Sequence, residues 1–176
     1  KRTQLALEGF STSGPYDAYR FHALSASGDV LDASVQNPAP GLVLVTVLGR
    51  GGDGTPSPSL VSAVAGALNA ERVRPLCDQV AVEAAGIVPF GVTAVLHPDH
   101  GPDPELARVA AEAAVRAMVA DAHRLGRAVR LSALFAALHQ PGIERVVLTA
   151  PAADVICTPG QAPWCTGLSV TLAPLS

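Results

Sequence analysis

The chain has 176 residues, 49% of them hydrophobic and 15% charged, and its formal net charge is −3. This composition supplies apolar material for one domain or two small ones and excludes the polar, highly charged character of a disordered chain. Lys1 is the single lysine and the eleven arginines are scattered, so we expect no nucleic-acid partner, because phosphate-binding domains cluster their basic residues.

The first half of the chain predicts the element order αββαβ. Residues 42–48 are apolar on both faces, which is typical of a central strand covered on both sides. Residues 37–41 are rich in Pro and Gly and predict a turn. Ser57 followed by Pro58 is a favourable helix start, and Gly28 is placed to end the first helix. The expected helix, two strands, helix and strand span residues 16–27, 29–35, 42–48, 57–68 and 80–84.

The second half predicts the order βααβ with trailing strands. Phe90, Val92, Ala94 and Leu96 alternate along one strand, and Asp103 caps a long helix. The expected elements are the strand 88–96, the long helix from Asp103 to Gly126, a short helix 131–139, the strand 143–149 and weaker strands 155–157 and 168–172. The residues expected to be buried are Leu106, Val109, Ala110, Ala113 and Ala117 on the long helix, and Leu131, Leu134, Phe135 and Leu138 on the short one.

These element orders favour an α+β fold made of two small α/β sandwich-like units, αββαβ followed by βααβ with trailing strands. The sequence has no internal repeat, and no low-complexity linker lies between the two units. Gly86 marks the change from one unit to the other. We therefore expect one domain at residues 1–86 and a second at residues 87–176.

The segment Gly49-Arg50-Gly51-Gly52-Asp53-Gly54 matches the G-x-G-x-x-G pattern of dinucleotide-binding loops, after a strand and before a helix. Pro56 and Pro58 have no N–H group to offer a phosphate at the helix start, and Asp53 adds a negative charge there. The preceding strand is also expected to be the second of a ββ pair, not the first of a βαβ unit. We favour a connecting loop and keep a nucleotide-binding enzyme as the alternative.

The segment His97-Pro98-Asp99-His100-Gly101-Pro102-Asp103 places two imidazoles and two carboxylates within seven residues, all of them metal-ligand types. The spacing matches no known ligand pattern, and the helix start already accounts for Asp103. We therefore expect no metal site and no cofactor. His123 and His139 lie near expected helix ends, where the helix dipole favours an imidazolium.

The sequence carries no recognisable catalytic motif. Residues 9–13 lack the last glycine of the G-x-S-x-G nucleophile elbow. Cys77, Cys157 and Cys165 form no C-x-x-C pair, so we expect reduced thiols that behave as small core residues. No apolar run approaches the roughly 20 residues that span a bilayer. We expect no catalytic residues, no small-molecule substrate and no membrane partner.

The chain carries an ordered series of sequence blocks at residues 18–26, 41–48, 52–56, 73–80, 125–127, 130–134, 141–146 and 162–166. Together these blocks resemble the baseplate J-like proteins of temperate contractile-tail phages. No single block is diagnostic, but they follow one another in order along essentially the whole chain. One departure is Cys77, where the family is expected to carry threonine.

The resemblance implies a structural component of a phage or prophage-derived baseplate wedge, with the family's middle domain at residues 1–86 and its C-terminal domain at 87–176. It implies other baseplate and tail proteins as partners, a place in the virion tail baseplate and synthesis in the host cytoplasm. The family has no known catalytic residues, so none is carried over. The chain alone is expected to be monomeric until its partners are present. A baseplate of a tailocin or secretion particle remains an alternative.

Overall fold

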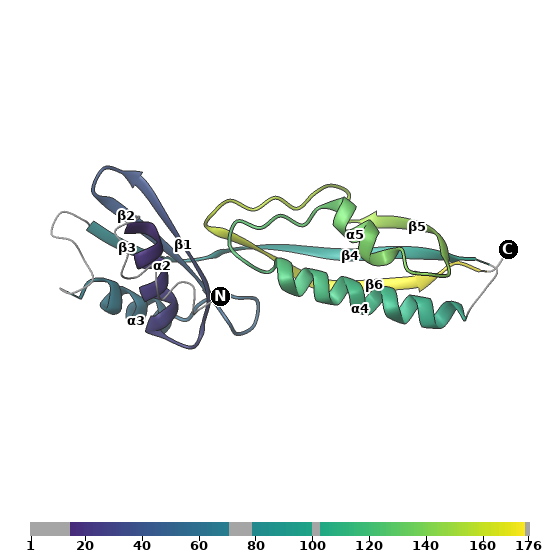
Figure 1. The fold of residues 1–176 in the computed structure, drawn as a ribbon, viewed down its shortest axis with the longest axis horizontal. Helices are drawn as coiled ribbons and strands as arrows, with labels where there is room; N and C mark the ends of the chain where they lie inside the picture. Colours follow the sequence, from purple (N-terminus) through teal and green to yellow (C-terminus); the bar gives the residue numbers. More distant parts are fainter. Residues whose placement is uncertain (1–14, 71–78, 100–102, 175–176) are drawn as a thin grey trace. The chain divides into compact units, whose positions relative to one another are not determined.

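The computed structural model describes residues 15–70, 79–99 and 103–174. Helices and strands are both present, so the α+β class predicted from the sequence is confirmed (Figure 1). The chain forms two compact units, and the first of them is built from two separate stretches of the chain. The first unit lies within Lys1–Ile87 and also takes in Thr158–Ala162, whereas the second comprises Val88–Cys157 and Pro163–Ser176.

The first unit has the predicted αββαβ order. Its elements are α2 (Pro15–Ala26), β1 (Val30–Ala39), β2 (Leu42–Gly49), α3 (Pro58–Leu68) and β3 (Gln79–Ala84). The strand order β1-β2-β3 places β2 in the centre of the sheet, with β1 antiparallel and β3 parallel to it. Because neighbouring β2 residues from Val45 to Leu48 are all buried, the strand is covered on both faces, as its sequence predicts.

Both helices of the first unit pack on one face of this sheet. Alternate residues of β2 point into that layer, since side chains of a strand alternate between faces. The buried cluster comprises Tyr19 and Ala23 from α2, Val43, Val45 and Val47 from β2, Val64 and Leu68 from α3, and Val30 and Ala33 from β1. The start of α3 is as predicted: the Ser57 hydroxyl accepts a hydrogen bond from the Leu60 N–H at 3.2 Å, and Pro58 is the first helical residue.

The opposite face of the sheet is contacted by the segment Thr158–Ala162, which returns from late in the chain. Thr46 is fully buried there, and its hydroxyl donates to Glu83 Oε1 at 2.9 Å. A Cβ added to Gly160 would lie 3.5 Å from Thr46 Oγ1, so the returning backbone packs directly against this pair. The Gly160 carbonyl also accepts a hydrogen bond from the Gly86 N–H at 2.9 Å.

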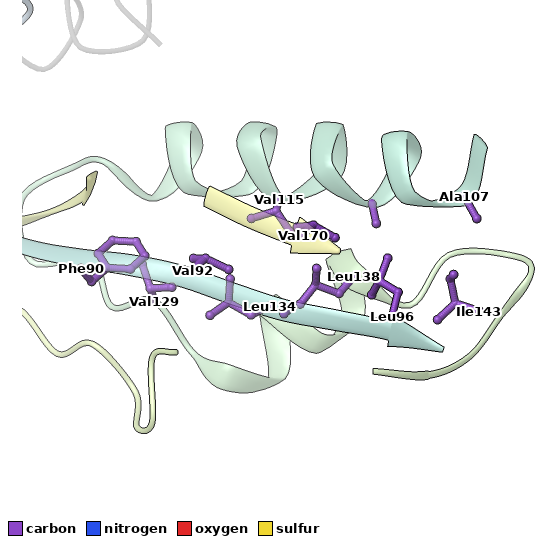
Figure 2. Packing of buried hydrophobic residues seen from close by; sticks show 12 residues of the cluster. Phe90, Val92, Leu96, Ala107, Val115, Val129, Leu134, Leu138, Ile143 and Val170 are labelled. Carbon is purple, nitrogen blue, oxygen red and sulfur yellow. The ribbon is translucent and has the colours of Figure 1, made fainter. Parts of the chain in front are cut away.

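The second unit has the predicted βααβ order followed by one strand. Its elements are β4 (Gly86–Pro98), α4 (Pro104–Ala122), α5 (Leu131–Leu138), β5 (Ile143–Ala150) and β6 (Gln161–Leu172). The strand order is β5-β4-β6, and β5 runs antiparallel to β4 with Val147 opposite Val95. The arrows of β4 and β6 point in the same direction in Figure 2.

The core of the second unit lies between this sheet and the two helices (Figure 2). Every second residue of β4, from Phe90 to Leu96, is buried in it, as predicted. The helices contribute Ala107, Ala111 and Val115 from α4 and Leu134 and Leu138 from α5. Asp103 caps α4 as predicted, because its carboxylate accepts a hydrogen bond from the Glu105 N–H at 3.0 Å.

Two helix ends differ from the prediction. Gly28 does not adopt the left-handed conformation, and the chain turns instead where the Ser27 carbonyl accepts a hydrogen bond from the Val30 N–H. Helix α4 ends at Ala122, and Gly126, with φ of 70°, lies in the turn beyond it. In both places the helix ends earlier than predicted, and the glycine lies in the turn that follows instead of directly after the last helical residue.

The prediction was wrong about the buried face of α4. All five residues assigned to that face, Leu106, Val109, Ala110, Ala113 and Ala117, are exposed. The face that packs on the sheet is the neighbouring one, which carries Ala107, Ala111 and Val115. The cause is that α4 is apolar over both faces, so a 3.6-residue period does not choose between them.

Three smaller predictions also need correction. Phe135 is 40% exposed although its neighbours Leu134 and Leu138 are buried, because it lies on the outer side of the short helix. Residues 155–157 form no strand; Val155 makes one isolated pair with Val129. The turn predicted at 37–41 is shorter, because β1 continues to Ala39.

Candidate functional site

The loop from Gly49 to Gly54 closes on itself. The Gly49 N–H donates to the Gly54 carbonyl at 2.7 Å, and the Gly54 N–H donates to the Gly51 carbonyl at 3.1 Å. The Arg50 N–H donates to the Asp29 carbonyl at 2.8 Å. A Cβ on Gly49 would lie 3.2 Å from the Gly54 carbonyl oxygen, so backbone already fills the loop. The amides of Gly49, Arg50 and Gly54 are therefore engaged within the protein and do not face a phosphate.

One argument against a nucleotide site was nevertheless wrong. Strand β2 is the second strand of a ββ pair, but it is also the first strand of a parallel βαβ unit, because α3 connects it to the parallel strand β3. The loop thus has the topological position of a nucleotide-binding turn. The loop differs from a nucleotide-binding turn in its local chemistry. The Ser57 hydroxyl already accepts a hydrogen bond at the N-terminus of α3, and the buried Pro56 before it has no N–H to offer a phosphate.

The described members of the segment from His97 to Asp103 do not gather as a ligand set. The His97 ring lies beside Arg145, whose Nη2 is 3.0 Å from His97 Nε2. Asp103 caps α4, the Asp99 N–H donates to the Gly142 carbonyl, and His100 lies outside the described residues. Within residues 15–70, 79–99 and 103–174, no three His, Cys, Asp or Glu side chains gather in a group that could hold a metal ion.

The two histidines near helix ends are where the sequence placed them. His123 follows the last residue of α4 and His139 follows the last residue of α5. The environment of His123 was not predicted: its ring is buried, its Nδ1 lies 2.7 Å from the Pro163 carbonyl oxygen, and it packs on Trp164 at 5.0 Å between ring centroids. A carbonyl only accepts, so Nδ1 carries the proton and joins the end of α4 to β6.

Of the cysteines, Cys157 is a free, buried thiol, and burial raises its pKa. Cys165 is free and half-buried. Cys77 and the residue pattern at 9–13 lie outside the described residues. Buried placement of Cys157 agrees with the predicted role as a small core residue.

Helix α4 has an exposed apolar face in addition to the face that packs in the core. Leu106 is 69% exposed and Val109 is 49% exposed. Together with the exposed Ala110, Ala113 and Ala117 they follow helical spacing along one side of the helix, and we call these five residues the α4 stripe. Burying such residues removes apolar surface from water, so a continuous stripe is a surface on which another element gains free energy by packing.

A ladder of alternating charges borders the α4 stripe. Arg108 Nε donates to Glu105 at 2.9 Å, Arg108 Nη1 donates to Glu112 at 2.9 Å, and Arg116 also donates to Glu112. The hydrogen bond from Arg108 lowers the pKa of Glu105, and those from Arg116 and then Arg108 lower the pKa of Glu112. The ladder is therefore fully ionised at neutral pH and carries two charges of each sign.

Other large apolar side chains are exposed singly. They are Tyr16 on α2, Phe135 on α5, Val147 on β5 and Ile156. Single exposed apolar residues are ordinary on protein surfaces. The α4 stripe differs because its members lie on successive turns of one helix. None of the described helices has the length and apolar character to cross a membrane.

Two family models match this chain in succession. The Baseplate J-like central domain matches residues 11–84, and the Baseplate J-like protein C-terminal domain matches residues 90–171. The chain belongs to the baseplate J-like family. The family resemblance read from the ordered sequence blocks is thereby confirmed.

The baseplate J-like chain is also similar to individual proteins. It is 45% identical over 165 residues to Baseplate protein J of Escherichia phage P2, an alignment that covers 94% of this chain and 55% of that protein. Its fold resembles a chain in the cryo-EM structure of the anti-feeding prophage (AFP) baseplate, with a TM-score of 0.56, 15% identity and coverage of 86% of this chain and 36% of that one. The chain spans about half the length of the phage P2 protein.

The family ranges and the compact units divide the chain differently at one point. Thr158–Ala162 lies within the range matched by the C-terminal domain model, yet it packs in the first compact unit. Sequence reasoning missed this return and also missed the ion pair between Arg20 and the buried Asp32, at 2.9 Å. Sequence reasoning did find the α4 stripe residues, but it assigned them to the core.

Proposed function

We propose that this baseplate J-like chain is a structural component of a contractile-tail baseplate wedge and acts in baseplate and tail assembly through protein–protein contacts. The observation that carries the proposal is the succession of the two family domains along the chain. The similarity to Baseplate protein J of phage P2 supports the same role. We further propose that the two domains meet near residue 86.

The proposed partners are other baseplate and tail proteins, and the proposed place is the baseplate of the virion tail after synthesis in the host cytoplasm. The α4 stripe supports protein partners, because a continuous apolar stripe on a helix is the type of surface that docks on another protein. We propose that the chain is not an enzyme and has no nucleic-acid, membrane or small-molecule partner. The self-contained hydrogen bonds of the Gly49 to Gly54 loop support the absence of a nucleotide.

The test is electron microscopy of induced lysates from a strain that lacks the gene, beside the same strain complemented with the intact gene. Heads without assembled tails, restored to complete particles by complementation, are expected. Normal contractile tails in the deletion strain would overturn the proposal. If the complemented strain yields contractile particles that never carry heads, the assembly is a tailocin or secretion-type particle, and the baseplate role stands within that setting.

A thermal-shift measurement tests the enzyme alternative separately. A nucleotide present at 100 times its dissociation constant stabilises the native state by about 2.7 kcal/mol. We expect no shift with NAD or ATP, and a saturable upward shift would restore the nucleotide-binding alternative.

A further inference from the structure

The segment Thr158–Ala162, which we call the clip, packs in the first unit, although the residues on both sides of it belong to the second. The chain leaves the second unit after Cys157 and re-enters it at Pro163. The range matched by the central domain model ends at residue 84 and therefore does not contain the clip. The first unit is thus completed by residues from the range of the C-terminal domain model.

The clip is a turn closed by its own hydrogen bonds. The Gln161 N–H donates to the Thr158 carbonyl at 2.8 Å, and the Thr158 N–H donates to the side-chain oxygen of Gln161 at 3.1 Å. Pro159 occupies the second position of this turn, where its fixed φ is favourable. Because the turn is held by local contacts, it presents Gly160 in a defined place.

The folded second unit fixes the chain on both sides of the clip. Shortly before it, Val155 and Val129 exchange two backbone hydrogen bonds, each at 2.9 Å. Shortly after it, the Pro163 carbonyl accepts a hydrogen bond at 2.7 Å from Nδ1 of the buried His123. The ends of the clip are therefore held by contacts that exist only while the second unit is folded.

The clip packs on a polar pair in the first sheet. Thr46 is fully buried, and its hydroxyl donates to Glu83 Oε1 at 2.9 Å. A Cβ added to Gly160 would lie 3.5 Å from Thr46 Oγ1 and 3.7 Å from Glu83 Oε1. The Gly86 N–H donates to the Gly160 carbonyl at 2.9 Å. These contacts give the clip a specific seat on the outer face of the sheet.

The clip keeps this seat only when its ends are held. If the second unit unfolds, the clip is carried by a loop made of residues 88–157, about 70 residues. Closing a flexible loop of that length lowers the population of the docked state on the order of several hundredfold. A net hydrogen bond such as the one from Gly86 to Gly160 favours docking by roughly fivefold, which does not offset that loss.

We propose that the clip acts as a latch that couples the stability of the two units. The folded second unit holds the clip on the first sheet, and the docked clip stabilises the first unit. Because a coupling between two equilibria is reciprocal, undocking of the clip lowers the stability of both units by the same factor. This inference goes beyond the proposed baseplate role and does not depend on it, since its tests use the isolated chain.

The first experiment changes one unit and measures the other. Val64→Ala removes methyl groups from a fully buried position on α3 of the first unit. Urea unfolding of the second unit is followed by the fluorescence of Trp164 and by hydrogen exchange of peptides from α5. If the units are coupled, Val64→Ala lowers the midpoint of the second unit by roughly 0.5–1 M urea. An unchanged midpoint, while exchange of β2 peptides shows that the first unit is destabilised, would overturn the proposal.

Two variants of Gly160 show whether the coupling passes through the clip. Gly160 has no left-handed φ, and its added Cβ would make ordinary contacts, so Gly160→Ala should keep the clip docked. The further carbons of Gly160→Leu must displace Thr46 and Glu83, so this variant should undock it. Val64→Ala should then shift the second unit's midpoint fully in the alanine background and by less than about 0.1 M in the leucine background. The same shift in both backgrounds would mean that the coupling runs elsewhere, and the latch would be rejected.

A second pair keeps the test decisive if Gly160→Leu does not fold. Gly160→Asp places a carboxylate beside Glu83, whereas the equally large Gly160→Asn has an amide that donates to it. Both residues are well tolerated in turns. Val64→Ala should therefore shift the midpoint of the second unit less in the aspartate background than in the asparagine background. Equal shifts in the two backgrounds would contradict docking of the clip on Glu83. Far-UV circular dichroism of every variant checks that it is folded before urea is added.

Discussion

Replacing one valine by alanine on each of the two apolar faces of α4 tests which face stabilises the fold. Val115 is fully buried in the core of the second unit, whereas Val109 is 49% exposed. Both lie in the interior of one long helix, so Val→Ala changes backbone propensity equally at the two sites. We expect Val115→Ala to destabilise the second unit by about 2 kcal/mol and Val109→Ala to change its stability by less than about 0.5 kcal/mol.

The magnitudes follow from burial. Val→Ala removes two methyl groups, and at about 0.8 kcal/mol for each buried group this costs about 1.6 kcal/mol at Val115. Incomplete collapse of the space left behind adds up to about 1 kcal/mol. The higher helix propensity of alanine returns about 0.5 kcal/mol at either position. At Val109 the smaller loss of burial and the gain in propensity nearly cancel.

Trp164 makes the assay specific for the second unit. It is the single tryptophan of the chain and packs on His123 at the end of α4. Urea unfolding followed by its fluorescence gives the free energy of unfolding of each variant. An equal loss of unfolding free energy at the two positions, or a larger loss at Val109, would refute the assignment of the inner face.

Three further perturbations test other contacts. Arg20→Ala should destabilise the first unit by about 1–3 kcal/mol in urea unfolding followed by circular dichroism, because it removes the guanidinium paired with the buried Asp32 carboxylate; an unchanged midpoint would contradict this. The hydrogen bond from Arg130 lowers the pKa of Asp154, so its stabilisation is complete above the ordinary carboxyl pKa of about 4 and is lost as pH falls toward the lowered folded value. The stability difference between the parent and Asp154→Ala should therefore shrink between about pH 6 and about pH 3, and a constant difference would count against the pairing. Because burial raises the pKa of Cys157, its alkylation near neutral pH should be at least roughly tenfold slower in the native than in the urea-unfolded chain, and peptide mapping that shows equal rates would place this thiol at the surface.

Local signals in the sequence predicted the local features of the fold. Ser57 with Pro58 and Asp103 with Pro104 each start a helix where expected, because a cap is a contact between residues two or three positions apart. The run of apolar residues in β2 predicted a central strand, and alternation along β4 predicted its buried face. These features depend on neighbours in sequence, so one sequence suffices to find them.

Contacts between distant segments could not be predicted in this way. The return of Thr158–Ala162 to the first unit depends on Gly160 lying against Thr46 and Glu83, which are far away in the sequence. Nothing near Gly160 indicates that surface. The ion pair of Arg20 with Asp32 likewise joins two elements whose relative position is set by packing and not by local propensity.

The error on α4 has a different cause, and it bears on function. Periodicity identifies an apolar face on the assumption that each helix has one, and the more strongly apolar face was taken as the buried one. Yet the face that packs in the core is the one with Ala107, Ala111 and Val115, and Leu106 and Val109 stay exposed. A monomeric domain has little reason to keep its larger apolar residues in water, whereas an assembly protein keeps them for its partner. The failure of the periodic prediction on α4 is therefore itself evidence for a docking surface, and the Val109 and Val115 variants separate stability from docking on a single helix.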